Sequence, residues 1–231
     1  MTPSHIAFIM DGNGRWAERR HMPRNYGHKM GTKALERVVD LAIKYEIKTV
    51  TFYAFSTENW SRPQKEIETL FEIFRKFLGE IDKYKDKNVK LHFIGNLGRF
   101  PQDIVDACSE MTAQTNKNDG LNVVVAMNYG SWEEITSAVN SLLAKGERTA
   151  TEEDVKNALY TAGISYPDVV VRTGGEVRLS NFLLLQSAYA ELIFTNTLWP
   201  DFDEKAFVEV LNEYASRVRK YGGLKKADVK A

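Results

Sequence analysis

The chain has 231 residues, of which 43% are apolar and 27% charged, a composition typical of a globular protein with one domain or two small ones and not of disordered or fibrous chains. Lysine plus arginine and aspartate plus glutamate number 31 each, so the formal net charge is zero and no overall field attracts nucleic acid or anionic lipid. We expect no nucleic-acid partner, and any anion-binding site must be local.

The sequence lacks the features of an exported, disulfide-bonded or membrane-spanning protein. Its single cysteine, Cys108, lies at an apolar helical position, which favours a buried thiol and excludes an internal disulfide or a multi-cysteine zinc site. The first residues have neither the basic start nor the cleavage site of a signal peptide. No run approaches the roughly 20 apolar residues that cross a bilayer. We expect a cytoplasmic protein.

Short apolar runs alternate with helical patterns along the whole chain. Several runs are nearly continuous, as strands buried on both faces are. They cover residues 5–10, 48–55, 89–95, 121–129, 167–172 and 191–195. Helical spacing predicts helices over 26–45, 67–84, 102–115, 132–143, 152–162 and 204–218, with a further helix starting near residue 15 and an apolar one following residue 181.

This alternation predicts an α/β fold with a mostly parallel sheet of about six strands and helices on both faces. We expect one domain over residues 1–223 and a tail outside it over 224–231. Ligands of such sheets gather beyond the carboxyl ends of the strands, so the residues that follow each apolar run are the first candidates for a site.

The first apolar run ends in Asp11-Gly12-Asn13-Gly14-Arg15-Trp16, where two glycines let the backbone approach a ligand. Arg15, Arg24 and His28 concentrate positive charge near this turn, which favours a diphosphate site, although a solvated helix face is the simpler interpretation for Arg19, Arg20 and Lys29. Asp11 is a natural Mg²⁺ ligand next to phosphates, or it is only a salt-bridge partner.

Two further segments carry polar side chains at strand ends. The loop over residues 56–63 contains Asn59 and Arg62 as candidate site residues. For Ser61 a helix cap is the simpler interpretation, and for Trp60 a position in the core. The turn over residues 172–181 brings two arginines and a serine to a second glycine pair and so predicts a second anion site. Glu191 lies in an apolar segment and is either a site residue or part of a structural ion pair.

Known nucleotide and calcium motifs are absent. The sequence has no G-x-x-x-x-G-K-[ST] loop and no G-x-G-x-x-G turn, and Arg15 and Trp16 occupy positions that an EF-hand reserves for an acid or amide and a glycine.

The chain resembles the cis-prenyltransferases of the undecaprenyl diphosphate synthase type from His5 to about Gly223. The resemblance is carried by HIAFIMDGNGRWA, RNYGHKMG, TFYAFSTENWSRP, NYGSWEEI, DVVVRTGGEVRLSNFLLLQ and YAELIFTNTLWPDFDE. It implies a homodimeric, Mg²⁺-dependent enzyme that condenses an allylic diphosphate such as farnesyl diphosphate with successive isopentenyl diphosphates. The implied product is a (Z)-polyprenyl diphosphate, foremost undecaprenyl diphosphate for a cell-wall lipid carrier, and membrane contact would be peripheral.

The resemblance also implies residue roles. Asp11 and Asn59 would be catalytic, and Asp11 and Glu191 metal-linked. The allylic diphosphate would be held by Gly12, Asn13, Gly14, Arg15, Trp16, Arg24, His28, Ser56 and Glu58. Isopentenyl diphosphate would be held by Asn59, Trp60, Arg62, Arg172, Arg178 and Ser180. Arg219 or Lys220 would reach the partner subunit, because the family's C-terminal Arg-x-Gly is displaced here.

A growing hydrocarbon needs an apolar channel. The stripe of Leu70, Phe71, Phe74, Phe77 and Leu78 beside Ala54 is a candidate wall, and ordinary core packing is its alternative. By family likeness Leu121 lies where the channel closes. Open alternatives for the function are a short-chain synthase, a non-catalytic accessory subunit and a phosphatase using Asp11. The proton acceptor stays open among Asp11, an Asn59-linked relay and the substrate's own diphosphate.

Overall fold

The computed structural model describes residues 2–217, except for the side chain of Ile81. The predicted tail over 224–231 and the two cations Arg219 and Lys220 lie outside the described residues. Among residues 2–217, no helix combines the length and the apolar character needed to cross a membrane.

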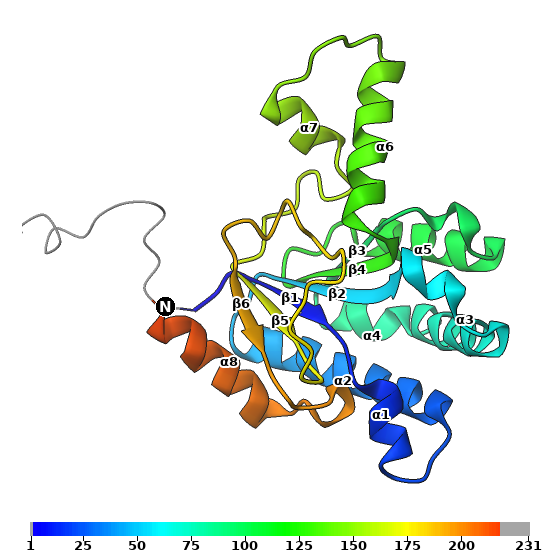
Figure 1. Ribbon diagram of the computed structural model, residues 1–231, viewed down its shortest axis with the longest axis vertical. Coiled ribbons are helices and arrows are strands. Elements are labelled where there is room, and N and C mark those ends of the chain that lie inside the picture. The colour runs from blue at the N-terminus through cyan, green and yellow to red at the C-terminus, as the bar shows by residue number, and fades with distance from the viewer. Residues whose placement is uncertain (1, 218–231) are drawn as a thin grey trace, which may run out of the picture.

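One six-stranded sheet forms the centre of the molecule (Figure 1). Its spatial order is β3-β4-β2-β1-β5-β6, and every neighbouring pair is parallel. The predicted fold class is therefore confirmed. The strands are β1 (His5–Ile9), β2 (Thr49–Ser56), β3 (Lys90–Ile94), β4 (Asn122–Tyr129), β5 (Val169–Arg172) and β6 (Glu191–Phe194).

The central strands are apolar on both faces because both faces are covered. In β1, Ile6 and Phe8 belong to one buried cluster while Ala7 and Ile9 belong to the other, on the opposite face. A strand alternates its side chains between faces, so two covered faces need a continuous apolar run rather than an alternating one.

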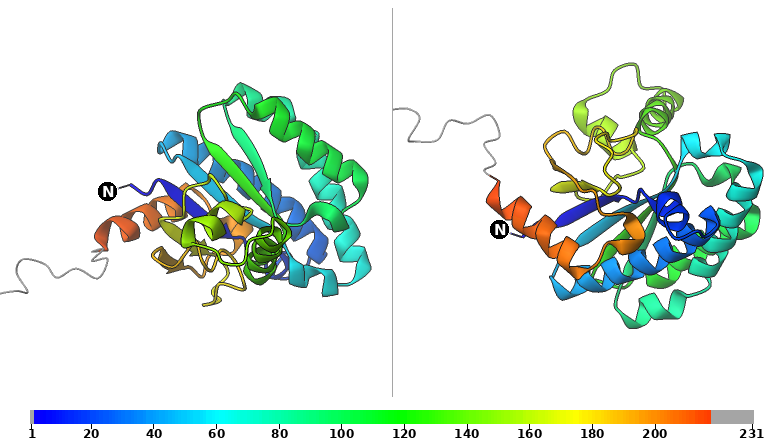
Figure 2. Two further views of the ribbon diagram at one scale, coloured as in Figure 1. Left: turned by 90° about the horizontal axis from the view of Figure 1, so that it is seen from above. Right: turned by 60° about the horizontal axis from the view of Figure 1, so that its bottom comes forward.

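The helices divide between the two sides of the sheet (Figures 1 and 2). Helices α2, α3, α5 and α8 contribute to the larger cluster, whereas α6 and α7 project from the opposite side. The helices are α1 (Asn13–Glu18), α2 (Arg24–Lys44), α3 (Gln64–Leu78), α4 (Ile81–Asp86), α5 (Gln102–Thr115), α6 (Ser131–Ala144), α7 (Glu152–Ala158) and α8 (Glu204–Ser216), with short 3₁₀ turns η1 (Thr57–Ser61), η2 (Leu97–Arg99) and η3 (Trp199–Asp201).

Three predicted helices differ from the structure. The helix expected over 67–84 is two helices, because α3 ends at the glycine Gly79. The helix expected over 152–162 stops at Ala158, and Thr151 and Asp154 form the capping box at its start. The apolar helix expected after residue 181 is absent, and turns with positive φ at Ser180, Asn181 and Leu183 replace it.

A buried carboxylate explains why residues 180–190 form turns. Glu134 is 1% exposed and accepts hydrogen bonds from Tyr129 Oη and from Gln186 Nε2 (2.9 Å), and weaker ones from the amide and hydroxyl of Thr161. Ser131 Oγ accepts the amide of Leu184 (2.8 Å). Because these polar groups bond to α6 and its surroundings, this apolar segment follows tertiary partners and not a helical ladder.

His5 gives the fold a measurable pH dependence. Its Nδ1 lies 2.6 Å from the carbonyl of Ser165 and must donate there, so Nε2 accepts from the Thr51 hydroxyl (2.8 Å). Burial lowers the pKa of His5 to about 4, and the backbone bonds and Asp168 only partly oppose this. The unfolded chain, with an ordinary histidine pKa of 6.5, binds the proton more readily.

We predict that the free energy of unfolding falls as pH drops from about 6.5 toward 4, by up to about 3 kcal/mol from this group. His5→Gln should remove that part of the slope, whereas the exposed His21→Asn should keep it; both variants retain His28 and His92. Urea unfolding between pH 4 and 8 measures this. Equal slopes in wild type and His5→Gln would assign the dependence to other groups.

Candidate active site

Polar side chains that follow the neighbouring strands β1 and β2 meet side chains of α2 at the carboxyl edge of the sheet. They surround a cavity of about 160 Å³ that combines one acid, two amides and several basic side chains. Its lining residues are Met10, Asp11, Gly12, Asn13, Gly14, Arg15, Arg24, His28, Tyr53, Ala54, Asn59, Arg62 and Leu70. The strand-end rule thus placed Asp11, Asn59 and Arg62 in one cavity.

Asp11 lies between two guanidinium groups. Arg172 Nη2 donates to Oδ2 (2.9 Å) and Arg15 Nη2 donates to Oδ1 (3.1 Å). Burial would raise the pKa of Asp11, but the hydrogen bond and charge of Arg172, with those of Arg15, hold it below the ordinary 3.8. Asp11 is therefore an ionised carboxylate with one hydrogen bond on each oxygen and free lone pairs on both.

Arg172 connects Asp11 to the second glycine turn. It is 5% exposed, and its Nη1 donates to the Arg178 carbonyl (2.7 Å) and to Ser180 Oγ (2.8 Å). Its Nε is buried without a partner. The buried guanidinium thus fixes Ser180 relative to Asp11 and uses most of its own donors in doing so.

Gly174 explains why a glycine pair follows Arg172. Its φ is +86°, and a Cβ atom there would lie 2.7 Å from Arg15 Nη2 and 3.1 Å from the Asp11 carbonyl carbon and oxygen. Only glycine fits both the left-handed backbone and this close approach.

Cations form one wall of the cavity. A Cβ on Gly14 would lie 2.7 Å from Arg24 Cζ, so this glycine lets Arg24 reach the cavity. His28 Nε2 lies 3.3 Å from Glu66 Oε1, which also accepts from Arg62 Nη1 (2.9 Å). Burial and the nearby charge of Arg62 lower the pKa of His28 despite Glu66.

The loop after β2 closes another side. Asn59 Oδ1 accepts the Ser56 amide (3.2 Å) and so shapes η1, while Asn59 also lines the cavity. Glu58 Oε1 accepts from Asn181 Nδ2 (3.2 Å), which joins this loop to the glycine turn after β5. Burial would raise the pKa of Glu58, but hydrogen bonds from its own backbone, Ser56, Asn181 and Thr57 lower it.

Two tryptophans that the family likeness placed at the substrates lie outside the cavity lining. Trp60 packs among aromatic rings, and its ring centroid lies 5.0 Å from that of Phe55 and 5.6 Å from that of Phe100. Its Nε1 donates to Asn128 Oδ1 (2.7 Å). Trp16 is 8% exposed, and its Nε1 donates to Asp201 (2.6 Å). Both side chains therefore pack outside the cavity lining. For Trp60 this agrees with the core position that the sequence left open as an alternative.

Arg178 and Ser180 lie at the rim. Arg178 is exposed and its Nη1 donates to Glu176 (2.6 Å), and Ser180 lies beside Arg172. Neither residue lines the polar cavity. The turn for which the sequence predicts a second anion site thus lies outside the lining of the polar cavity.

The structure does not bring Glu191 to Asp11. Glu191 opens β6 and pairs with Val169 at the amino end of β5, whereas Asp11 follows the carboxyl end of β1. Arg217 Nη1 donates to Glu191 Oε2 (2.8 Å). Within one chain Glu191 is therefore ion-paired with Arg217 and lies at the other end of the strands from Asp11.

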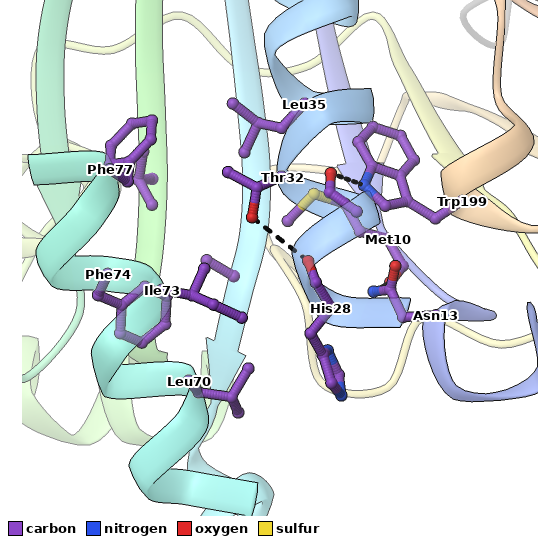
Figure 3. A pocket seen from close by; sticks show the side chains of 13 residues that line it. Met10, Asn13, His28, Thr32, Leu35, Leu70, Ile73, Phe74, Phe77 and Trp199 are labelled. Atoms are coloured by element: carbon purple, nitrogen blue, oxygen red, sulfur yellow. Dashed lines mark hydrogen bonds between the residues drawn. The ribbon is translucent and has the colours of Figure 1, made fainter. Parts of the chain in front are cut away.

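An apolar cavity of about 80 Å³ adjoins the polar one between α2 and α3 (Figure 3). Met10, Asn13, His28, Ala54 and Leu70 line both cavities, so the two are contiguous. Four expected wall residues, Ala54, Leu70, Phe74 and Phe77, line the apolar cavity; Phe71, Leu78 and Leu121 do not. Phe71 contacts Trp60 and Phe100, and Leu121 is buried in the core.

Sequence reasoning missed Tyr53 and Glu66. Tyr53 Oη donates to the Tyr129 carbonyl (3.0 Å) and approaches the Ser180 carbonyl (3.3 Å), and burial raises its pKa. Its place near the end of β2 was an available signal. For Glu66 the signal was its spacing of four residues from Arg62, which is typical of a helical ion pair.

The comparisons with known proteins agree on one family. The family model described as a putative undecaprenyl diphosphate synthase matches residues 9–222. The chain belongs to this cis-prenyltransferase family. It is 43% identical to the isoprenyl transferase of Fusobacterium nucleatum, with 96% of this chain and 97% of the relative covered. It is also 43% identical to the ditrans,polycis-undecaprenyl-diphosphate synthase ((2E,6E)-farnesyl-diphosphate specific) of Yersinia pseudotuberculosis, with 100% and 94% covered.

Solved structures of cis-prenyltransferases have the same fold. Lavandulyl diphosphate synthase from Lavandula x intermedia, in complex with dimethylallyl diphosphate, matches with a TM-score of 0.92 at 31% identity over 96% of this chain and 98% of that one. A probable undecaprenyl diphosphate synthase from Campylobacter jejuni matches with a TM-score of 0.82 at 31% identity over 96% and 99%. The cis-prenyltransferase is thus an enzyme that transfers prenyl groups, as the sequence predicted.

Gly174→Ala should damage this site beyond its effect on the backbone. Gly146 has nearly the same φ, +85°, and a Cβ added to it would meet nothing within 4 Å, so Gly146→Ala measures backbone strain alone, about 1–2 kcal/mol. We expect Gly146→Ala to leave the rate of prenyl transfer unchanged and Gly174→Ala to lower it at least about 10-fold by displacing Arg15 from Asp11, a loss of about 1.4 kcal/mol or more. Steady-state rates and urea unfolding of both variants test this; equal rates would show that the close approach is unimportant.

Proposed function

We propose that this cis-prenyltransferase condenses farnesyl diphosphate with successive isopentenyl diphosphates to give a long (Z)-polyprenyl diphosphate, foremost undecaprenyl diphosphate. The observation that carries this proposal is the contiguity of a cationic cavity with an apolar one. A diphosphate head and a hydrocarbon tail need these two environments side by side. The Yersinia relative is a ditrans,polycis-undecaprenyl-diphosphate synthase that is specific for (2E,6E)-farnesyl diphosphate.

The cationic wall binds and activates the allylic diphosphate. Arg15, Arg24 and His28 would hold its oxygens, with the glycines of the turn over 11–14 allowing backbone approach. As the allylic carbon–oxygen bond breaks, negative charge accumulates on the departing diphosphate. Fixed cations in a partly buried cavity stabilise that charge and so lower the barrier.

Mg²⁺ fits Asp11 better than a metal that needs a complete protein site. No group of three His, Cys, Asp or Glu in residues 2–217 would hold an ion. Mg²⁺ binds through one or two carboxylates plus phosphate oxygens, and Asp11 is ionised with free lone pairs. When bound there, Mg²⁺ would help to neutralise the departing diphosphate. Of the two expected metal-linked acids, only Asp11 lies in the cavity.

Isopentenyl diphosphate would lie on the open surface beside Arg178 and Ser180, with Asn59 and Arg62 facing it across the cavity. Its terminal alkene carbon forms the new bond to the allylic carbon as the allylic diphosphate leaves, which places positive charge on the neighbouring methyl-bearing carbon. A proton then leaves the CH₂ group next to that carbon, and the new double bond forms. Asp11 has a pKa below 3.8 and is therefore a weak base. This favours the diphosphate, whose phosphate oxygens titrate nearer pH 6, as the acceptor. An Asn59-linked relay to it is compatible with the position of Asn59 on the cavity wall.

A short-chain cis-prenyl diphosphate synthase is the second candidate. The apolar cavity holds only about 80 Å³, the space of a few water molecules, so a C55 chain needs α2 and α3 to separate. The match to lavandulyl diphosphate synthase also favours a small product. Product length distinguishes the two candidates.

We further propose a homodimer in which membrane contact is peripheral. Large apolar side chains are exposed on α6 and along residues 177–189, including Trp132 (70%) and Tyr189 (76%). The start of α6 contacts the turn over 181–184 through Ser131, and exposed apolar side chains on adjoining segments are typical of a protein interface. Sedimentation of wild type and Trp132→Glu compares the oligomeric states directly.

Incubation with Mg²⁺, farnesyl diphosphate and radiolabelled isopentenyl diphosphate should give a ladder of products ending near C55. EDTA should abolish it. Asp11→Asn should lower the rate about 10²- to 10³-fold, while the surface variant Asp103→Asn, which removes the charge opposite Arg75, should not. A single addition would establish the short-chain alternative, and no extended product at all would overturn the proposal.

The two diphosphates should depend on different arginines. We expect Arg24→Ala to raise the KM for farnesyl diphosphate and Arg178→Ala to raise the KM for isopentenyl diphosphate, each about 10-fold, which is the loss of one charge-assisted contact of about 1.4 kcal/mol. Each variant should change the other KM less than threefold. Similar increases in both constants for either variant would refute the separate sites.

A further inference from the structure

Three segments from distant parts of the sequence meet at Asn181. It directly follows Ser180 on the turn after β5, and its side chain contacts both η1 after β2 and the first residues of α6 after β4. It is half-buried, and no comparison or motif assigns it a role.

The side-chain amide and the backbone carbonyl of Asn181 connect these segments. Asn181 Nδ2 donates to Glu58 Oε1 (3.2 Å), and Oδ1 accepts from the backbone amide of Trp132 (3.2 Å). The Asn181 carbonyl accepts from the amide of Ser131 (2.8 Å). The side chain thus spans the gap between the loop that carries Glu58 and the turn that carries Ser180.

The backbone is arranged to admit this amide. Asn181 has a φ of +63°, a left-handed conformation that asparagine tolerates better than most residues. A Cβ on Gly130 would lie 2.6 Å from Asn181 Nδ2 and 2.7 Å from Thr57 Oγ1. Gly130 therefore provides the space in which η1, α6 and the turn after β5 approach one another.

We infer that Asn181 is a positioning residue that couples the loop around the allylic diphosphate to the turn around isopentenyl diphosphate. The inference rests on the proposed function for the identity of the two ligands. Arg172, at the end of β5, bonds to Ser180 and so fixes this turn relative to Asp11. Asn181 bonds to Glu58 on η1 and so fixes the same turn relative to the loop after β2. An anion that orders one segment thereby orders the other.

The bond between Asn181 and Glu58 can be broken and then rebuilt with reversed polarity. Asn181→Asp keeps an oxygen for the Trp132 amide but places a carboxylate against Glu58. Glu58→Gln alone keeps the acceptor oxygen. In the double variant Asn181→Asp/Glu58→Gln the glutamine donates to the new aspartate, so the bond returns.

We expect Asn181→Asp to raise the KM for isopentenyl diphosphate at least 10-fold and to speed amide exchange in residues 57–61, with the double variant recovering most of both effects. Asn157→Asp is the matched control, because Asn157 Nδ2 makes the same 3.2 Å bond to Glu153 on exposed α7. It should change neither measurement.

Hydrogen exchange needs no substrate, so it separates this inference from the proposed function. Rescue of exchange without activity toward these substrates would support the coupling and refute the substrate assignment. Double-variant effects equal to the product of the single effects, in both measurements, would overturn the coupling. If Asn181→Asp fails to fold, Glu58→Ala removes the same hydrogen bond from the side of an exposed loop. Unchanged amide exchange across residues 178–181 in the Glu58→Ala variant would also overturn the coupling.

Discussion

The ion pair between Asp11 and Arg172 is the contact on which the site depends. Arg172 ends a strand buried on both faces, and its charge would be costly there without a partner. Asp11 supplies that partner, and the same guanidinium holds Ser180 and the Arg178 carbonyl. One buried cation thereby joins the ends of two neighbouring strands, and it orients the Asp11 carboxylate relative to the Ser180 hydroxyl.

The fold was predictable because burial on both faces leaves a strong signal. The continuous apolar run of β4 (Asn122–Tyr129) has no other simple interpretation between two helical patterns. The same reasoning failed after residue 181, where an apolar segment was expected to be helical. What decides that segment is the carboxylate of Glu134 and the hydroxyl of Ser131, both supplied by a helix some fifty residues earlier in the chain. The composition of the segment itself does not reveal such distant hydrogen-bond partners.

The site was predictable where the strand-end rule applied and not elsewhere. Asp11 and Arg172 follow or end strands and meet as expected, whereas Glu191 begins one and lies at the opposite edge. For Trp60 the sequence could not separate a cavity wall from a core position, because an indole serves both. Glu66 looked like an ordinary helical charge, and only the packing of α2 against α3, which brings His28 to it, gives it a place in the site.

The contiguous cavities suggest how one enzyme accommodates a tail that changes in length. In the proposed reaction the diphosphate head would be held at the strand ends by fixed charges, so each added unit would move hydrocarbon deeper between α2 and α3. Burial of a CH₂ group is worth about 0.8 kcal/mol, so a five-carbon unit gains about 3 kcal/mol or more if the walls part at little cost. Leu70 and Phe74 are also core residues, and separating them from their neighbours opposes that gain. On this proposal, elongation would stay favourable until the cost of parting the helices equals the gain from burying the next unit, and the packing of α3 would set that balance.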